Sequence, residues 1–172
     1  MSDADAKLPP ISATVICLNE ADRIERCLES LWFCDEIVVV DSGSSDGTRE
    51  IARKYADKVI EQPFLGYVKQ ENFALDRASH DWVVCIDADE AISPELAANI
   101  RGALARDDGR FGGYALDRVT WYLGVWHDLG EWYPDWQLRV FRRSRGHWGG
   151  LDPHDRVEVD GPVQRLSGRL LH

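Results

Sequence analysis

Apolar, β-rich segments alternate with segments of helical periodicity over the first 105 residues, and this alternation constrains the fold most. The expected strands are 11–18, 36–40, 58–61 and 82–86. The first expected helix opens at a capping box at 22–25. Three further helices are expected at 48–55, 68–78 and 93–105. Repeated strand–helix–strand units form right-handed crossovers, so the chain predicts an α/β fold with a mostly parallel sheet flanked by helices.

The alternation stops at Asp107. Residues 112–121, 137–142 and 157–159 are expected strands separated by aromatic, glycine-rich loops, which predicts a mixed sheet in the second half. The acidic, proline-ended residues 1–10 predict a disordered lead-in and not a signal peptide. The remaining residues, 11–172, fit one domain with halves 11–106 and 107–172.

Composition excludes several classes of partner. A formal net charge of -10 disfavours binding to nucleic acid or to anionic lipid, because both draw on clustered Lys and Arg. No apolar stretch approaches the ~18 residues of a membrane span. The four cysteines form no Cys-x-x-Cys pair, which predicts reduced core thiols. The absence of a signal peptide and of an apolar span predicts a cytoplasmic location.

Polar residues follow three of the predicted strands. They are Asn19-Glu20, Asp41 and the segment Asp87-Ala88-Asp89-Glu90. Ligands of open parallel sheets bind beyond the carboxyl ends of the strands, so these residues predict one ligand site. The alternative is that each residue caps the helix that follows it.

Two carboxylates one residue apart, Asp87 and Asp89, suit Mg²⁺ or Mn²⁺, which take one or two protein carboxylates plus substrate phosphates. The implied ligand is a nucleoside diphosphate. Asp41 could accept the N3–H of a uracil; alternatively, its carboxylate bonds the backbone near Gly43. No Gly-x-Gly-x-x-Gly follows the first strand, which argues against a dinucleotide dehydrogenase, and the sequence has no P-loop.

Three segments, residues 13–20, 38–48 and 87–90, resemble in order and spacing the inverting family 2 glycosyltransferases. The resemblance runs from about residue 11 to 172 and implies a GT-A fold, which is Rossmann-like. Residues 132–143 further resemble the lipopolysaccharide core β-1,4-glucosyltransferases, which use UDP-glucose at the cytoplasmic membrane face. The first half would then bind the nucleotide and the second the acceptor, a saccharide or glycolipid. Membrane contact would come from a helical tail that continues beyond His172 in relatives.

The resemblance also implies roles for individual residues. Asp155, which follows Gly149-Gly150 and His154, is the candidate catalytic base, with Asp135 in reserve. Asp89, Asp87 and His172 are the candidate metal ligands, although His172 could instead be a frayed terminus. Nucleotide-sugar contacts are expected from Leu18, Asn19, Glu20, Asp41, Gly43, Asp87 and Ala88, and acceptor contacts from Trp132, Trp136, Gln137, Arg139 and His154. Lys69 and Asn72 could touch the diphosphate, or lie on a solvated helix face.

Two other functions use the same motif. In haloacid-dehalogenase phosphatases the first Asp of Asp-x-Asp is a nucleophile, but it normally follows the first strand, whereas Asp87 follows the fourth. A non-catalytic sugar or cation-binding module would bind a UDP-sugar without consuming it.

Overall fold

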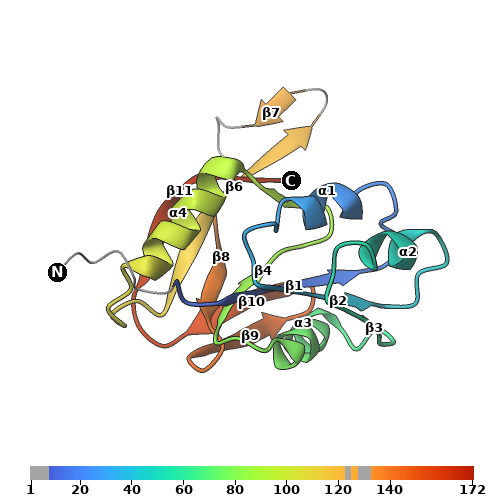
Figure 1. The fold of residues 1–172 in the computed structure, drawn as a ribbon, viewed down its shortest axis with the longest axis horizontal. Coiled ribbons are helices and arrows are strands. Elements are labelled where there is room, and N and C mark those ends of the chain that lie inside the picture. The colour runs from blue at the N-terminus through green and yellow to red at the C-terminus, as the bar shows by residue number, and fades with distance from the viewer. Residues whose placement is uncertain (1–7, 123–124, 128–132) are drawn as a thin grey trace.

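The computed structural model describes residues 8–122, 125–127 and 133–172, and its main feature is one twisted mixed sheet (Figure 1). In the described residues this sheet has nine strands in the order β3-β2-β1-β4-β8-β6-β11-β5, with β7 paired to β6. The strands are β1 (Ile11–Cys17), β2 (Glu36–Asp41), β3 (Lys58–Glu61), β4 (Trp82–Cys85), β5 (Ala91–Ile92), β6 (Gly113–Tyr122), β7 (Val125–His127), β8 (Asp135–Arg142) and β11 (Val163–Leu171).

Strands β1 to β4 are parallel, as predicted: β1 pairs in parallel with both β2 and β4, and β2 pairs in parallel with β3. The second half is mixed, also as predicted. Strand β8 runs antiparallel to β4 and β6, while β11 runs parallel to β6 and antiparallel to β5. Since β8 pairs directly with β4, the two halves of the chain share one sheet.

Helices cover both faces of this sheet. On one face lie α1 (Ile24–Glu29), α2 (Thr48–Ala52) and α4 (Pro94–Ala105), whose apolar residues join those of β1 and β2 in the largest core cluster. The other face is covered by α3 (Tyr67–Arg77) and by a separate hairpin of β9 (Gly146–Leu151) and β10 (His154–Val159). None of the helices in the described ranges is long and apolar enough to cross a membrane.

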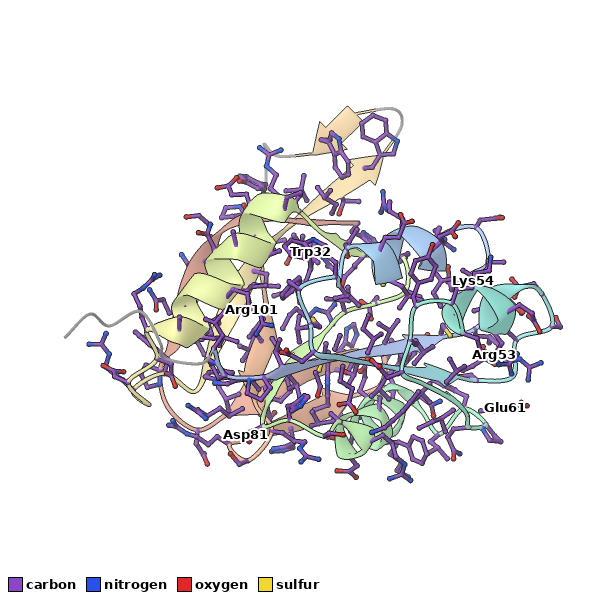
Figure 2. All side chains as sticks on the ribbon, viewed as in Figure 1. Trp32, Arg53, Lys54, Glu61, Asp81 and Arg101 are labelled. Atoms are coloured by element: carbon purple, nitrogen blue, oxygen red, sulfur yellow. The ribbon has the colours of Figure 1, made fainter. Side chains whose placement is uncertain are left out.

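Helix α4 begins as predicted, with a capped first turn and an arginine that bonds it to neighbouring segments. Ser93 accepts a hydrogen bond from the Leu96 N–H, and Pro94 occupies the first turn, where a missing N–H costs nothing. Arg101, labelled on α4 in Figure 2, pairs with Asp35 at 2.9 Å and donates to the carbonyl of Pro9. The helix is therefore attached to the residues that precede β1.

Some predicted boundaries were wrong. Helix α1 begins at Ile24 after Arg23, without a side-chain cap, so the predicted capping box does not form. Helix α2 ends at Ala52, three residues before the predicted end. The prediction omitted β5, β7, β9 and β11, because these strands are short or rich in polar residues and have no continuous apolar run. Most of the predicted lead-in, residues 1–7, lies outside the described residues.

Candidate active site

A cavity of about 930 Å³ opens where β1 and β4 end and where β8 and the β9–β10 hairpin approach them. Eleven of the predicted site residues line it: Leu18, Glu20, Asp87, Ala88, Asp89, Trp136, Gln137, Arg139, His154, Asp155 and His172. They come from both halves of the chain. The predicted convergence of the post-strand residues therefore occurs for Glu20 and residues 87–89, whereas Asn19 and Asp41 do not line the cavity.

At one end of the cavity Asp89 meets His172. The distance between Asp89 Oδ2 and His172 Nε2 is 3.3 Å, and Arg23 approaches the same carboxylate at 3.6 Å. The hydrogen bond between the two residues lowers the pKa of Asp89 and raises the pKa of His172. Backbone bonds between His172 and both Val119 and Trp121 fix the histidine beside β6, so it is not a frayed end here. In Figure 1 β11 runs beside β6, in agreement with these contacts.

Asp87 belongs to a buried ion network. Arg139 donates to Asp87 at 2.7 Å and to Glu90 at 3.1 Å, and Glu90 in turn accepts the backbone N–H of Asp87. Burial opposes the charge of Arg139, but the neighbouring carboxylates outweigh it and raise its pKa. Arg139 is only 5% exposed and holds Asp87; because it also lines the cavity, its contact with an acceptor stays a prediction.

Asp155, on β10, stands opposite Gly150 of β9 and lines the cavity with His154. Burial raises the pKa of Asp155, and the nearby charge of Asp87 raises it further. Gly150 has a φ of 93°, and a Cβ there would lie 2.5 Å from the carbonyl oxygen of His154. A glycine is therefore required for the hairpin to present Asp155 in this position.

Of the two roles expected for Asp41, the structure shows the second, in which the carboxylate bonds the backbone of its own loop. Its side chain is fully buried: Oδ1 accepts the N–H groups of Gly43 and Ser44, and Oδ2 accepts the Ser44 hydroxyl. Asn19 lies beside this loop with a φ of 55°, which Asn tolerates, and its Oδ1 accepts the N–H of Ser45. Asp41, Gly43 and Asn19 do not line the cavity, so contact with a base stays a prediction for them.

Three further candidates are placed elsewhere. Lys69 is exposed on α3, as in the solvated-face alternative. Asn72 bonds the backbone of Trp148, and Asp135 accepts from Arg118 at 2.8 Å and from Gln137 at 2.5 Å. The predicted diphosphate contacts and the reserve base are thus not supported by position. Trp132 lies outside the described residues.

Several residues of the site were missed. Glu71 of α3 is 2% exposed and lines the cavity; burial raises its pKa well above the ordinary value. Arg118, Trp148, Phe64 and Tyr67 also line it, and the last two rings pack edge to face at 5.0 Å. A helical pattern places Glu71 one residue from Gln70 and Asn72 but cannot indicate that it faces a cavity. No sequence signal identified it.

A divalent cation fits the donors present, although they form a small set. Within the described residues no three His, Cys, Asp or Glu side chains form a group able to hold a metal by themselves. Asp89 and His172 do converge, and they offer the oxygen and nitrogen donors that such an ion accepts. Mg²⁺ and Mn²⁺ commonly take one or two protein ligands and complete their shell with substrate phosphates and water. The pair therefore suits a cation that arrives with a phosphorylated substrate.

Known proteins resemble this chain over most of its length. The family model for glycosyl transferase family 2 matches residues 12–159. The chain is 35% identical over 170 residues to the lipopolysaccharide core biosynthesis glycosyltransferase LpsC of Rhizobium meliloti (strain 1021). That match covers 95% of this chain and 63% of LpsC, so the chain spans less than two thirds of that relative.

Two solved structures share the fold. The mannosyltransferase PcManGT of Pyrobaculum calidifontis, in complex with GDP-Man and Mn²⁺, is 28% identical, with a TM-score of 0.56 over 66% of this chain and 36% of that one. S. aureus TarS 1-349 in complex with UDP-GlcNAc is 26% identical, with a TM-score of 0.52 over 70% of this chain and 37% of that one. From the family match, the relative and these folds together, the chain belongs to glycosyl transferase family 2 and has the GT-A fold.

Proposed function

We propose that this domain transfers a sugar from a UDP-sugar to a saccharide acceptor in one metal-dependent displacement that inverts the anomeric centre. The similarity to LpsC and the resemblance of residues 132–143 support glucose as the sugar and the lipopolysaccharide inner core as the acceptor. The UDP-GlcNAc complex of TarS and the Mn²⁺ complex of PcManGT support a nucleotide-sugar donor and a divalent cation. We also propose that the reaction takes place in the cytoplasm, at the inner face of the membrane.

One observation carries this proposal: Asp89 with His172, and Asp155, line the same cavity. The first pair would hold Mg²⁺ or Mn²⁺, which neutralises charge on the departing UDP when bound. Leu18, Glu20 and Ala88 line the same cavity and would contact the nucleotide. Trp136, Gln137 and His154 also line this cavity and would contact the acceptor, because aromatic faces suit sugar rings.

The chemistry assigned to Asp155 is removal of a proton. Its carboxylate takes the proton of the acceptor hydroxyl while that oxygen bonds to the anomeric carbon and the bond from this carbon to the UDP oxygen breaks. The raised pKa of Asp155 makes it a stronger base than an exposed aspartate. Arg139 holds Asp87 beside the sugar by its 2.7 Å bond. A single displacement needs no covalent intermediate.

The decisive experiment is a screen of UDP, GDP and dTDP sugars for metal-dependent binding and transfer. We expect UDP-sugars to bind in the presence of Mn²⁺, with sugar released to an acceptor or to water. In calorimetry Asp89→Ala should lose metal-dependent UDP binding, while Asp108→Ala, a change in an exposed loop, should bind as wild type does.

Other outcomes point to the two alternatives. Binding of a UDP-sugar with no turnover would indicate a non-catalytic module. Release of phosphate from an aryl phosphate would indicate phosphatase chemistry, which membership of family 2 already disfavours. Equal UDP affinity in Asp89→Ala and wild type would contradict the metal site.

A further inference from the structure

Asn72 bonds both backbone polar groups of one residue on the β9–β10 hairpin. Its Nδ2 donates to the carbonyl of Trp148 at 2.8 Å, and its Oδ1 accepts the N–H of Trp148 at 3.0 Å. The same Nδ2 also lies 2.9 Å from the carbonyl of Val68, one turn back on α3. The side-chain amide of Asn72 thus makes the two backbone bonds that a neighbouring strand would make to Trp148. The N–H and C=O of Trp148 both have partners.

A second bond joins the turn of the hairpin to the start of α3. Oδ1 of Asp152 accepts the N–H of Val68 at 3.1 Å, which satisfies one of the free donors of the first helical turn. Gly66 permits this approach, because a Cβ there would lie 2.3 Å from Asp152 Oδ2 and its φ is 93°. The first attachment lies at the middle of β9, and the second lies in the turn just after it.

The hairpin needs such attachments. In the described residues β9 and β10 form a sheet of their own and pair with no strand of the large sheet. A two-stranded hairpin is marginally stable by itself. Its apolar residues Trp148 and Val157 share a core cluster with Leu75 and Phe141, and this packing is non-directional. Hydrogen bonds are directional, so they can fix its position.

The position of the hairpin matters to the cavity, because His154, Asp155 and Val157 all line it from β10. We infer that Asn72 and Asp152 are positioning residues that hold the β9–β10 hairpin on α3 and so set the place of Asp155 relative to the donor-side residues. This inference rests on the proposed function for the role of Asp155. The attachment itself can be tested without activity.

The test compares Asn72→Ala, Asp152→Ala and Asp152→Asn with a matched control, Asn99→Ala. Asn99 also donates from a helix to a backbone carbonyl, that of Ser167 at 3.0 Å, but it does not line the cavity. Asp152→Asn keeps the oxygen that accepts from Val68, so it should restore what Asp152→Ala loses. Because Asp152 is exposed, neither of its variants should fail to fold.

Expected results separate positioning from general destabilisation. For Asn72→Ala we expect kcat to fall about 10- to 100-fold, because a catalytic group displaced by about 1 Å can lose this much rate. The fall for Asp152→Ala should be smaller. The KM for the UDP-sugar and the affinity for UDP with Mn²⁺ should stay near wild type, because donor-side residues are untouched. Amide hydrogen exchange of residues 146–159 should accelerate in both variants. Asn99→Ala and Asp152→Asn should match wild type in all of these measurements.

Two results would overturn the inference. One is hydrogen exchange of residues 146–159 in Asn72→Ala that equals the wild-type rate. The other is parallel loss of UDP affinity and kcat, as general unfolding would give. If wild type transfers no sugar at all, the proposed function fails, whereas the exchange experiment still decides whether Asn72 and Asp152 hold the hairpin.

Discussion

Glu36 and Glu71 are both buried glutamates beside the parallel strands, with exposures of 7% and 2%, yet their surroundings are opposite. Glu36 begins β2, at the end of the sheet away from the cavity. Its carboxylate accepts from Ser12, from both the N–H and hydroxyl of Ser79, and from Lys58. Burial alone would raise its pKa, but these bonds outweigh burial and lower the pKa to about 2.

Glu71 lines the cavity at the other end. Burial raises its pKa, the charge of Asp87 raises it further, and Arg139 offsets only part of this. Glu90, in the same network, also has a raised pKa because it is buried. The comparison teaches that this fold satisfies carboxylates where they only support the sheet. At the cavity, Arg139 offsets only part of the burial of Glu71, which favours a bound cation or a donor hydroxyl beside this carboxylate.

The largest effect expected from this comparison is on rate at the ligand-facing end. Asp155→Asn removes the proposed base and should lower kcat by about 10²- to 10⁴-fold, while KM for the UDP-sugar changes little. In wild type the rate should fall as pH drops through the raised pKa of Asp155, because the base must be ionised. Steady-state kinetics of Asp155→Asn against Asp160→Asn, in an exposed turn, measures this. Unchanged turnover in Asp155→Asn would remove it from the role.

The next effect is on stability, through Arg139. Arg139→Met leaves Glu90 and Asp87 without the guanidinium that pairs with both, and we expect the free energy of unfolding to fall by on the order of 3 kcal/mol. Urea denaturation at pH 7 gives the value. The control is Arg53→Met, on the surface in Figure 2, where the side chain is 59% exposed and the loss should be below about 0.5 kcal/mol. Equal losses in the two variants would mean that the buried network contributes little.

Arg139 also shows where reading the sequence reaches its limit. Its place in the segment 132–143 indicated an acceptor contact, whereas packing beside β4 gave it Asp87 and Glu90 as partners. The parallel arrangement of the first strands was predictable, because repeated strand–helix–strand units form right-handed crossovers, whereas the order of the strands comes from the structure. The place of Asp87 and Asp89 at the carboxyl edge of the parallel strands was also predictable, whereas the roles of Asp155 and His172 came from the family resemblance.

Contacts between distant segments were not predictable in this way. Asn72 and Trp148 are 76 residues apart, and no local pattern indicates that an amide on α3 will bond β9. Asp41 was open between two roles, because a carboxylate after a strand can accept from a ligand or from its own loop. The folded structure shows which donors the carboxylate takes, and here they are the N–H groups of Gly43 and Ser44 in its own loop.

A smaller effect is expected at the satisfied end of the sheet. Glu36→Gln should lower the free energy of unfolding by about 2 kcal/mol at pH 7, because charged hydrogen bonds to Lys58 and Ser79 are weakened. A lowered pKa contributes stability above the ordinary value of 4.5, and this contribution is lost as pH falls toward about 2. The difference between wild type and Glu36→Gln should therefore shrink over that range. A difference that is constant with pH would mean the carboxylate charge is not responsible, and Glu50→Gln, 66% exposed, serves as the control.

The smallest effect distinguishes the two glutamates most directly. The raised pKa of Glu71 means that ionisation costs the folded state more than the unfolded state, so its charge opposes folding as pH rises above the ordinary value of 4.5. Glu71→Gln removes this opposition while keeping the side-chain volume, and the free energy of unfolding at pH 7 should fall by no more than about 0.5 kcal/mol, or rise. Paired denaturation curves of Glu36→Gln and Glu71→Gln measure the contrast in one experiment. A loss for Glu71→Gln as large as that for Glu36→Gln would show that the carboxylate at the cavity is as well satisfied as the one that supports the sheet, and that the opposition between the two ends does not exist.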